Sequence, residues 1–514
     1  MKINLIIKIL LILLFCNNIS NAQSLLFPQD YIVEQIKYNE TILIAKDSIH
    51  RPGIFPFANG IDTLTFYKAN RKWLSKKLLQ DNFINIKKND TINNEVNEIK
   101  ICVDPVFNFS VGREYLNNKT INTYNNTRGV LAFLSINKNL KLETAFIENQ
   151  SVFPELLSEQ IKNKNEVLGL GRWKTFKENG FDYAMSAGIL WWKINNHIQL
   201  YTGHGKQKIG NGYRSFFLSD LAFNYPFARF DFSFFKSKIN YSITNAVLMN
   251  LSPTVNINNN RPPGTEPLLQ KKPFSFQYLN YTMNKVLQFG FFQGIVWPAS
   301  NEKNRLNLSA NYFNPILFSN LATYGFNSKP NILAGFDCKI NLTKTFDFYF
   351  QLCTDGKKDS LKKTQSIGLQ SGLKWFNAFG LKNLFVQFEY NEFTNALYQQ
   401  SIKNSQDSYS HYNSSLAYPI NSNTGNELVS IIAWRYKRML FSIKNNYFES
   451  AGTDNLLSEG KLSFILQPKT NMNFSVGFIS RDIHKSQSQI NSNKSTWLFI
   501  SFATSLYNRY FDTE

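Results

Sequence analysis

Hydrophobic and polar residues alternate with a period of two along much of the chain after Ile99. Successive side chains of a β-strand point to opposite faces of the sheet, so this alternation predicts strands with one apolar and one polar face. A further segment near the C-terminus predicts a last strand whose apolar face carries Leu498, Ile500, Phe502, Leu506 and Tyr510. The clearest alternating segments are 228–234, 306–312, 346–352, 384–390 and 472–478.

The connections between these segments differ strongly in length. Some are tight, as at Asn195-Asn196 and Lys437-Arg438, and others are long and polar, as at Asn250–Lys272 and Tyr398–Asn426. Short turns at one end and long loops at the other are typical of outer-membrane barrels. At about 23 residues per strand with its connection, the chain from Ile99 onward predicts an all-β, transmembrane antiparallel β-barrel of about 18 strands, with 16 as the neighbouring even number.

The first residues have the pattern of a secretory signal peptide. Lys2 and Lys8 precede or flank an apolar run, and Ser20-Asn21-Ala22 forms a small-residue cleavage site. We therefore predict that residues 1–22 are removed after Ala22. We predict that this segment directs export and that the mature chain lies in the outer membrane of a Gram-negative envelope.

Residues 23–98 are more charged and alternate less regularly than the rest. Within Arg71–Ile86, apolar residues recur at roughly helical spacing, which predicts a helical segment. We interpret residues 23–98 as a small N-terminal periplasmic portion and residues 99–514 as the barrel. A second short helix is predicted in the loop at 151–166, which interrupts the strand pattern.

Composition agrees with a barrel. Phe, Tyr and Trp together make up 15% of the chain, and aromatic girdles are a feature of outer-membrane barrels. Three cysteines, Cys102, Cys338 and Cys353, remain after the signal peptide, at spacings that form no disulfide framework. Cys338 and Cys353 bracket a predicted hairpin turn near Asn341–Lys344 without facing each other across it, so we expect free thiols.

The formal net charge is +20, of which two charges leave with Lys2 and Lys8. A basic balance suits an acidic partner such as lipopolysaccharide or an anionic polysaccharide. A codon bias, visible in the many Lys, Asn and Ile residues, explains the charge equally well. Nothing in the sequence indicates nucleic acid.

The most unusual stretch runs from Tyr201 to Phe232. Four glycines, Gly203, Gly205, Gly210 and Gly212, fall within ten residues of it. Such a cluster predicts irregular and closely packed backbone, typical of a site at the rim of a sheet or barrel. Its spacing matches neither a phosphate loop nor a dinucleotide-binding fingerprint.

Catalysis and metal binding have weak support in this stretch. His204, Ser219 and Asp220 are the residue types of a nucleophilic triad, but the chain has no G-x-S-x-G motif, and a turn explains the pair at 219–220. The five histidines are scattered, without H-x-x-x-H or H-E-x-x-H spacing. We predict a protein that is not an enzyme and that holds no metal or cofactor.

Carbohydrate binding fits the residue types better. Sugars are held by aromatic faces together with planar polar groups, and cations hold acidic sugars. The simpler explanation is that the aromatic residues form a membrane girdle and that the polar residues fill the lumen. The candidate ligand-binding residues for a polysaccharide are His204, Lys206, Asn211, Tyr213, Arg214 and Asp220.

Several segments, in this order between about residues 100 and 240, resemble the Wzi-like family of capsule-assembly outer-membrane proteins, and especially its RemB-like relatives from gliding bacteria. These segments are NTRG (Asn126–Gly129), ENQSVFP (Glu148–Pro154), GLGRWKTF (Gly169–Phe176), GFDYAMSAG (Gly180–Gly188) and GHGKQKIGNGYRSFFLSDLAFNYP (Gly203–Pro226).

The resemblance implies an 18-stranded outer-membrane barrel with a periplasmic helical portion. In the Wzi branch it implies a surface lectin for capsular polysaccharide, and in the RemB-like branch a surface component associated with the gliding machinery. We therefore predict a non-enzymatic barrel that binds or organises capsular or exopolysaccharide at the cell surface. A porin-like channel for small solutes is the alternative.

Overall fold

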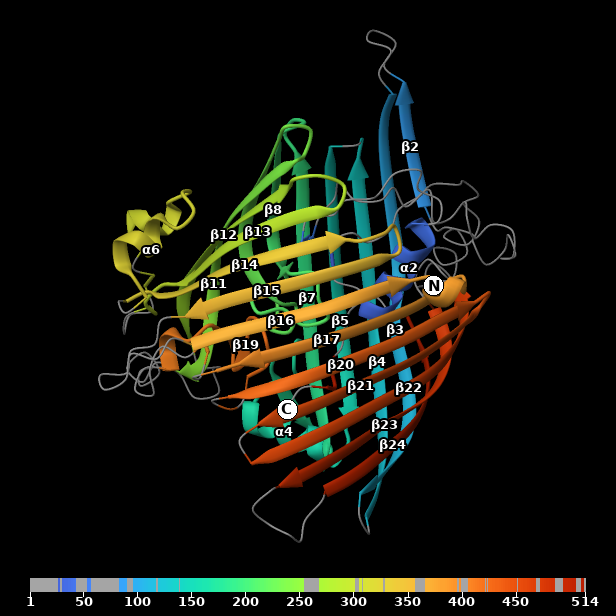
Figure 1. Cartoon of the computed structure of the whole chain (residues 1–514). Coiled ribbons are helices and arrows are strands. Elements are labelled where there is room, and N and C mark those ends of the chain that lie inside the picture. The colour runs from blue at the N-terminus through green and yellow to red at the C-terminus, as the bar shows by residue number, and fades with distance from the viewer. Residues whose placement is uncertain are drawn as a thin grey trace, which may run out of the picture.

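The computed structural model contains a closed antiparallel barrel (Figure 1). Within the described residues the barrel has eighteen strands, as predicted. The described residues are 26–27, 30–42, 53–56, 83–89, 96–116, 119–137, 139–253, 268–300, 305–306, 308–326, 329–355, 366–394, 397–398, 405–420, 422, 424–450, 452–467, 472–485, 493–504 and 510–512.

The barrel strands follow one another around the wall in chain order, and pairing of β24 with β3 closes it. The barrel strands are β3 (Val96–Leu116), β4 (Lys119–Ile136), β5 (Leu140–Val152), β7 (Gly180–Lys193), β8 (Ile198–Gly205), β10 (Tyr225–Phe234), β11 (Ile239–Pro253), β12 (Leu269–Thr282), β13 (Leu287–Val296), β14 (Asn331–Asn341), β15 (Phe346–Asp355), β16 (Ser366–Phe376), β17 (Leu384–Phe393), β20 (Gly425–Tyr436), β21 (Met439–Ser450), β22 (Thr453–Gln467), β23 (Met472–Lys485) and β24 (Asn493–Ala503).

Shorter elements accompany the wall. They are β1 (Ile54–Phe55), β2 (Phe83–Asn89), β6 (Trp173–Phe176), β9 (Lys208–Ile209), β18 (Ser410–His411), β19 (Ser414–Ser415), the helices α2 (Tyr31–Ile42), α4 (Glu155–Lys164) and α6 (Ser319–Tyr324), and the 3-10 helices η2 (Ala310–Phe313), η3 (Ala378–Gly380) and η4 (Ser405–Asp407).

The two faces of the wall differ in the way that the alternation predicts. On β10, Arg229 and Asp231 are buried toward the interior, whereas Phe230 and Phe234 are more than 40% exposed on the outside. The same pattern recurs on β15, β17 and β23. A wall that is apolar outside and polar inside suits lipid outside the barrel. Among the described helices, none has both the length and the apolarity needed to cross a membrane.

The strand connections divide the barrel into two ends. Turns such as 194–197, 235–238 and 437–438 lie at one, the short-turn end. The long connections, including the one that carries α4, lie at the other end, here called the long-loop end. A few short links, such as the one between β21 and β22, lie there too. This asymmetry confirms the prediction from connection lengths, and α4 confirms the short helix expected at 151–166.

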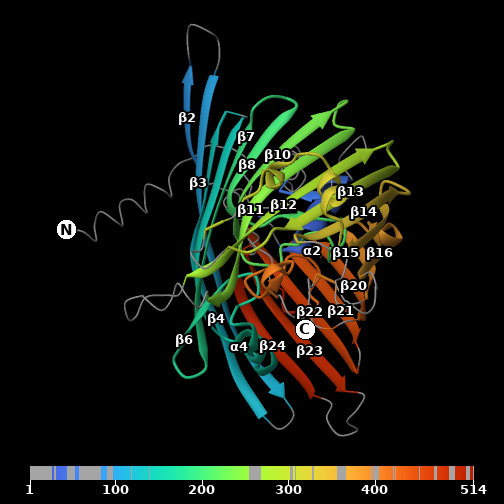
Figure 2. The same ribbon diagram turned by 90° about the vertical axis from the view of Figure 1, so that its left-hand side faces the viewer.

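The N-terminal region departs from prediction in its elements. Residues 71–82 of the predicted helix lie outside the described residues, and residues 83–86 belong to β2, which pairs with β3 and extends beyond the wall (Figure 2). Apolar residues in a short segment fit a strand as well as a helix. Here residues 96–102 of β3 extend past the pairing with β24, and β2 pairs with this edge as a strand. The helix described nearby is α2, which lies inside the barrel and contacts β17 and β20. The predicted signal peptide, residues 1–22, lies outside the described residues.

One predicted strand was wrong, and the predicted last strand is present but shorter than expected. The described residues of the segment 306–312 form irregular chain and η2, and Tyr312 packs in a small core with Ile295, Trp297 and Ile332. The last strand ends at Ala503, and Tyr510 is buried inside the barrel instead of continuing the outer face. In both cases a tertiary contact determines the conformation of a segment with strand-like alternation.

The cysteines agree with prediction. Cys102, Cys338 and Cys353 form no disulfide, and the first and third are buried. Across the hairpin of β14 and β15, Cys338 faces Phe350 and Cys353 faces Gly335. The predicted turn between them is present.

Candidate functional site

The glycine-rich stretch enters the barrel. β8 ends at Gly205, and residues 206–224, here called the lumen segment, cross the interior before β10 begins at Tyr225. Phe216 and Phe217 in this segment are fully buried. The expectation of a site at the barrel rim is therefore corrected: the stretch starts at the rim and fills the lumen.

Glycine is required where the lumen segment passes close to other groups. Gly210 has φ of +143°, a conformation that residues with a side chain rarely adopt. A Cβ atom on Gly212 would lie 2.5 Å from Glu389 Oε2 and 2.6 Å from Gln370 Oε1. These two positions allow the backbone to lie directly against polar side chains of the wall.

Gly212→Ala should destabilise the protein by about 1–3 kcal/mol, because the added methyl group displaces the buried Glu389 carboxylate. The measurement is urea unfolding of the protein in lipid vesicles. Gly188→Ala is the matched control, since a Cβ there meets nothing closer than Thr144 Oγ1 at 3.7 Å. Equal effects of the two changes would contradict the close approach at Gly212.

Polar side chains of the opposite wall hold the backbone of the lumen segment. Glu389 on β17 accepts hydrogen bonds from the backbone N–H groups of Tyr213 (2.6 Å) and Arg214 (3.0 Å). Gln351 on β15 accepts one from the N–H of Phe216 at 2.6 Å. Buried backbone groups need such partners, so the wall is built around this segment.

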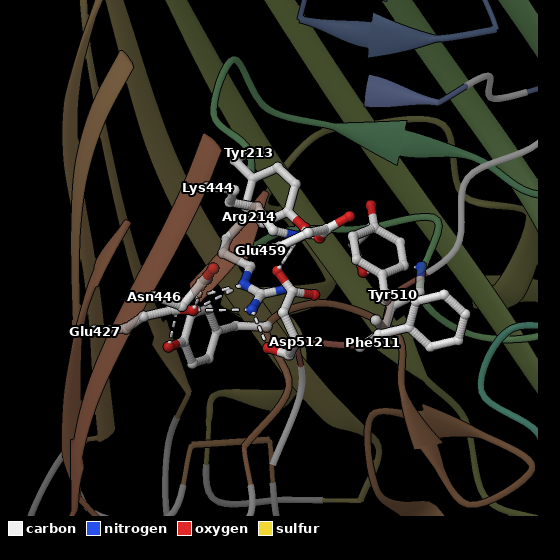
Figure 3. Close-up of polar contacts among 12 residues, drawn as sticks. Tyr213, Arg214, Glu427, Lys444, Asn446, Glu459, Tyr510, Phe511 and Asp512 are labelled. Atoms are coloured by element: carbon white, nitrogen blue, oxygen red, sulfur yellow. Dashed lines mark hydrogen bonds and ion pairs between the residues drawn. The ribbon is translucent and has the colours of Figure 1, made fainter. Parts of the chain in front are cut away.

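Arg214 lies at the centre of a buried charge network (Figure 3). Its guanidinium is 2.8 Å from Glu427 of β20 and 3.5 Å from Asp512 near the C-terminus. Lys444 of β21 bridges Asp512 at 3.1 Å and Glu459 of β22 at 3.0 Å. The network thus joins the lumen segment, the wall and the last described residues.

The C-terminal residues fold back into the lumen. Tyr213 donates its hydroxyl hydrogen to Asp512 Oδ2 at 2.6 Å, and Tyr510 donates to Asp220. Burial alone would raise the pKa of Asp512, but the charges of Arg214 and Lys444 hold that pKa well below its ordinary value. The carboxylate therefore stays ionised and anchors the chain end.

A second layer covers the lumen segment on its long-loop side. Tyr398 and Tyr409 donate their hydroxyl hydrogens to the carbonyl oxygens of Phe216 (2.9 Å) and Phe217 (2.7 Å). Ser219 donates its hydroxyl hydrogen to Ala417 O at 2.8 Å. The described residues of the connection between β17 and β20 thus fold into the barrel and pack on the lumen segment.

Helix α2 covers the other side. The ring of Tyr31 packs edge-on against that of Tyr213, with centroids 5.1 Å apart. Toward the short-turn end, Glu40 pairs with Arg435 at 3.0 Å. The lumen segment is therefore enclosed between α2 and the β17–β20 connection, and these elements together form a plug.

Glu166 joins two loops at the long-loop end. Its Oε2 accepts hydrogen bonds from Ser414 Oγ (2.8 Å) and from the N–H of Asn413 (3.3 Å). Burial raises the pKa of Glu166 to about 7, although those hydrogen bonds and the charges of Lys164 and Lys206 oppose the shift. This carboxyl group consequently changes charge near neutral pH.

Because its pKa is raised, Glu166 contributes more to the free energy of unfolding at low pH than at high pH. An acid whose pKa is higher in the folded state binds its proton more tightly there, so stability rises as pH falls through about 7 toward the unfolded value. Glu166→Gln mimics the protonated form. The stability advantage of this variant over wild type should shrink by about 2–3 kcal/mol between pH 8 and pH 5. Urea unfolding at both pH values measures it, and a pH-independent difference would contradict a titrating Glu166.

The predicted ligand residues fall into separate surroundings. Tyr213, Arg214 and Asp220 contact the C-terminal residues inside the lumen. Lys206 is buried and donates to the carbonyl oxygen of Asp220 at 2.9 Å. Asn211 is half-buried in the lumen segment.

His204 stands apart from these residues on β8. It lies opposite Gly188 and Pro226, and its Nδ1 is 3.2 Å from Ser186 O. The sequence reasoning did not identify Glu389, Glu427, Lys444 or Asp512. Inward-facing charge in an alternating strand was the available signal for Glu389, Glu427 and Lys444, whereas Asp512 lies outside the strands and had none.

Ser219 and His204, two of the three residue types of a nucleophilic triad, contact different parts of the structure. Ser219 faces main-chain carbonyls of the β17–β20 connection, while the His204 ring faces Ser186. In the described part of the chain, no group of three or more His, Cys, Asp or Glu side chains is placed to hold a metal ion.

Comparison with solved structures finds similar barrels. Wzi, described as an outer-membrane protein involved in group 1 capsule assembly in Escherichia coli and as a carbohydrate-binding β-barrel, matches with a TM-score of 0.55 and 11% identity over 93% of this chain and 99% of that one. A BenF-like porin from Pseudomonas fluorescens Pf-5 matches with a TM-score of 0.44 and 8% identity over 79% and 99%. At such identity the likeness to Wzi shows the fold. Comparisons with protein-family models and with curated proteins find no match.

Proposed function

We propose that this chain is an outer-membrane barrel that binds or organises polysaccharide at the cell surface. By the usual orientation of such barrels, the short-turn end faces the periplasm and the long-loop end faces the outside. Residues 1–22 are proposed to direct export and to be removed after Ala22.

The plug carries this proposal. Buried side chains from the lumen segment, α2, the β17–β20 connection and the C-terminal residues occupy the interior, as described above. A porin-like channel needs a water-filled lumen, so a lumen occupied by these segments favours binding over transport. The fold likeness to a barrel described as carbohydrate-binding supports the same function.

The six candidate residues are proposed to serve binding mainly through the plug. Lys206, Tyr213, Arg214 and Asp220 are buried and hold chain segments together, so they position the surface loops above them. His204 and Asn211 are half-buried, so a sugar reaches their side chains more readily than those of the four buried residues. Acidic sugar or the phosphates of lipopolysaccharide suit the basic balance of the chain. A contribution to gliding, as in RemB-like proteins, is the proposed cellular role if motile cells carry this polysaccharide.

The test is binding of the detergent-refolded protein to the surface polysaccharide of its own host, measured across a salt series. Saturable binding that weakens with salt would support the proposal. The double variant Lys206→Ala/Arg214→Ala should lose binding because the plug loosens. Lys162→Ala/Lys174→Ala is the matched control, since it removes two exposed lysines at the same end and leaves the plug intact.

The outcomes separate binding from transport. Absence of binding by folded wild type, together with steady ion conductance in planar bilayers, would replace the proposal by the porin-like channel. Loss of binding only in Lys162→Ala/Lys174→Ala would keep the function and place its cationic contact on the surface loops.

A further inference from the structure

The connection between β13 and β14 lies on the outside of the barrel. Its described residues 305–306 and 308–326, here called the outer flap, include η2 and α6 (Figure 1). Tyr312 of the flap packs on Trp297 and on Ile295 and Ile332, which lie on the outer face of β13 and β14. The flap therefore covers part of the wall that would otherwise be exposed.

The flap pairs with polar side chains that point outward from the wall. Asn245 on β11 donates to Tyr312 O at 2.7 Å, and Gln277 on β12 donates to Asn314 O at 3.0 Å. Their neighbours on the same strands, Thr244 and Tyr278, are buried toward the interior, so the outward direction follows from the alternation. Without the flap, these amide groups would face the surroundings of the barrel.

The contacts extend far along the wall. Tyr241, whose hydroxyl donates to Pro315 O, is the third residue of β11 counted from the short-turn end. The flap begins at the long-loop end, where β13 ends at Val296. It consequently reaches along most of the outer face of β11, level with the exposed Phe230 and Phe234 of neighbouring β10.

The sequence of the flap suits an apolar environment. Residues 306–328 contain no Asp, Glu, Lys, Arg or His, in a chain that is 18% charged. Arg305 and Lys329 flank this stretch. On the side away from the wall, Leu308, Phe313 and Ile316 are 44%, 59% and 64% exposed.

Many polar groups of the flap are satisfied internally. The N–H groups of Tyr312, Ala322 and Gly325 bond to carbonyl oxygens within the flap, and Asn320 donates to Asn311 O at 3.1 Å. Irregular chain is tolerated at membrane depth only where its polar groups have partners. Here the wall and the flap supply them to each other.

We propose that the outer flap lies within the hydrocarbon layer of the membrane, with lipid acyl chains against Leu308, Phe313, Pro315 and Ile316. The flap thereby shields the outward amides of the wall from lipid. This inference rests on the proposed membrane location of the barrel.

The test uses a bimane fluorophore on Ile316→Cys, in a background with Cys338→Ala, and quenching by brominated lipids in vesicles. Leu352→Cys on the outer face of β15 is the lipid-facing control, and Glu178→Cys in the turn after β6 is the water-facing control. Bimane at position 316 should lose as much fluorescence to brominated lipid as bimane at position 352.

Each other outcome has a distinct meaning. Quenching at 352 but not at 316, with iodide quenching 316 as it quenches 178, would overturn the inference by placing the flap in water. Protection of 316 from both quenchers would overturn it in favour of a second protein copy on this face. Failure of lipid quenching at 352 itself would instead refute the membrane location.

Discussion

Replacing Arg214 by methionine should destabilise the protein by about 3–5 kcal/mol, the cost of leaving buried charges without their partner. Methionine keeps much of the side-chain volume, so the loss is mainly electrostatic. Glu427 and Asp512 would keep their buried negative charges, with Lys444 as the remaining cation of the network. Urea unfolding in vesicles measures the change, and ion conductance in planar bilayers reports whether the plug has loosened.

Asp512→Asn is the matched comparison for Arg214→Met. Without the Asp512 charge, Arg214 still pairs with Glu427 and Lys444 still pairs with Glu459. The cost should then be about 1–3 kcal/mol, the value of lost hydrogen bonds to a charged group. A second change, Glu427→Gln, should recover part of the loss in the Arg214→Met protein. If Asp512→Asn proved as costly as Arg214→Met, the buried-charge account of the network would be wrong.

The strands were predictable because the alternation is local. On β15, the residues Phe346, Phe348, Phe350 and Leu352 face outward in the sequence pattern and in the structure. An apolar outer face and a polar lumen impose the same two-residue period on nearly every strand, so the pattern needs no knowledge of distant contacts. Connection lengths then gave the two ends of the barrel and the approximate strand number.

The plug was not predictable by the same reasoning. Arg214 meets Glu427 and Asp512, which lie more than 200 residues away in the chain. Alternation marks Glu427 as an inward-facing residue but does not state which group it faces. The glycine cluster correctly indicated close packing, yet its location inside the lumen depends on wall residues such as Glu389 and Gln351.

Local alternation also failed where a segment packs on the wall instead of joining it. Residues 306–312 alternate in sequence, but their burial does not: Leu308, Ser309 and Ala310 are all exposed, and Tyr312 is buried against the outer face. Tyr510 has the spacing of an outward strand residue, but its hydroxyl bonds to Asp220 inside the barrel. A two-residue pattern in the sequence thus also occurs in segments that are not strands, so the sequence alone does not separate the two cases.

Phe217→Ala should lower the free energy of unfolding by about 3–5 kcal/mol, because it leaves a cavity in the tightly packed centre of the plug. The ring is fully buried and stacks on Phe292 of β13, with centroids 4.9 Å apart and planes at 5°. Phe478→Ala is the control: this side chain is 41% exposed on the outer face of β23. The control loses apolar transfer energy without a cavity, which should cost about 1–2 kcal/mol.

A compensating change on the wall makes this prediction sharper. A Cβ on Gly335 of β14 would lie 2.1 Å from a carbon of the Phe217 ring, so Gly335→Ala should destabilise the wild-type protein. In the Phe217→Ala protein the same methyl group enters the space that the ring has left, and the change should become neutral or stabilising. Reversal of sign between the two backgrounds requires direct packing of the plug on the wall. Simple additivity of the two changes would show that the ring does not occupy this site.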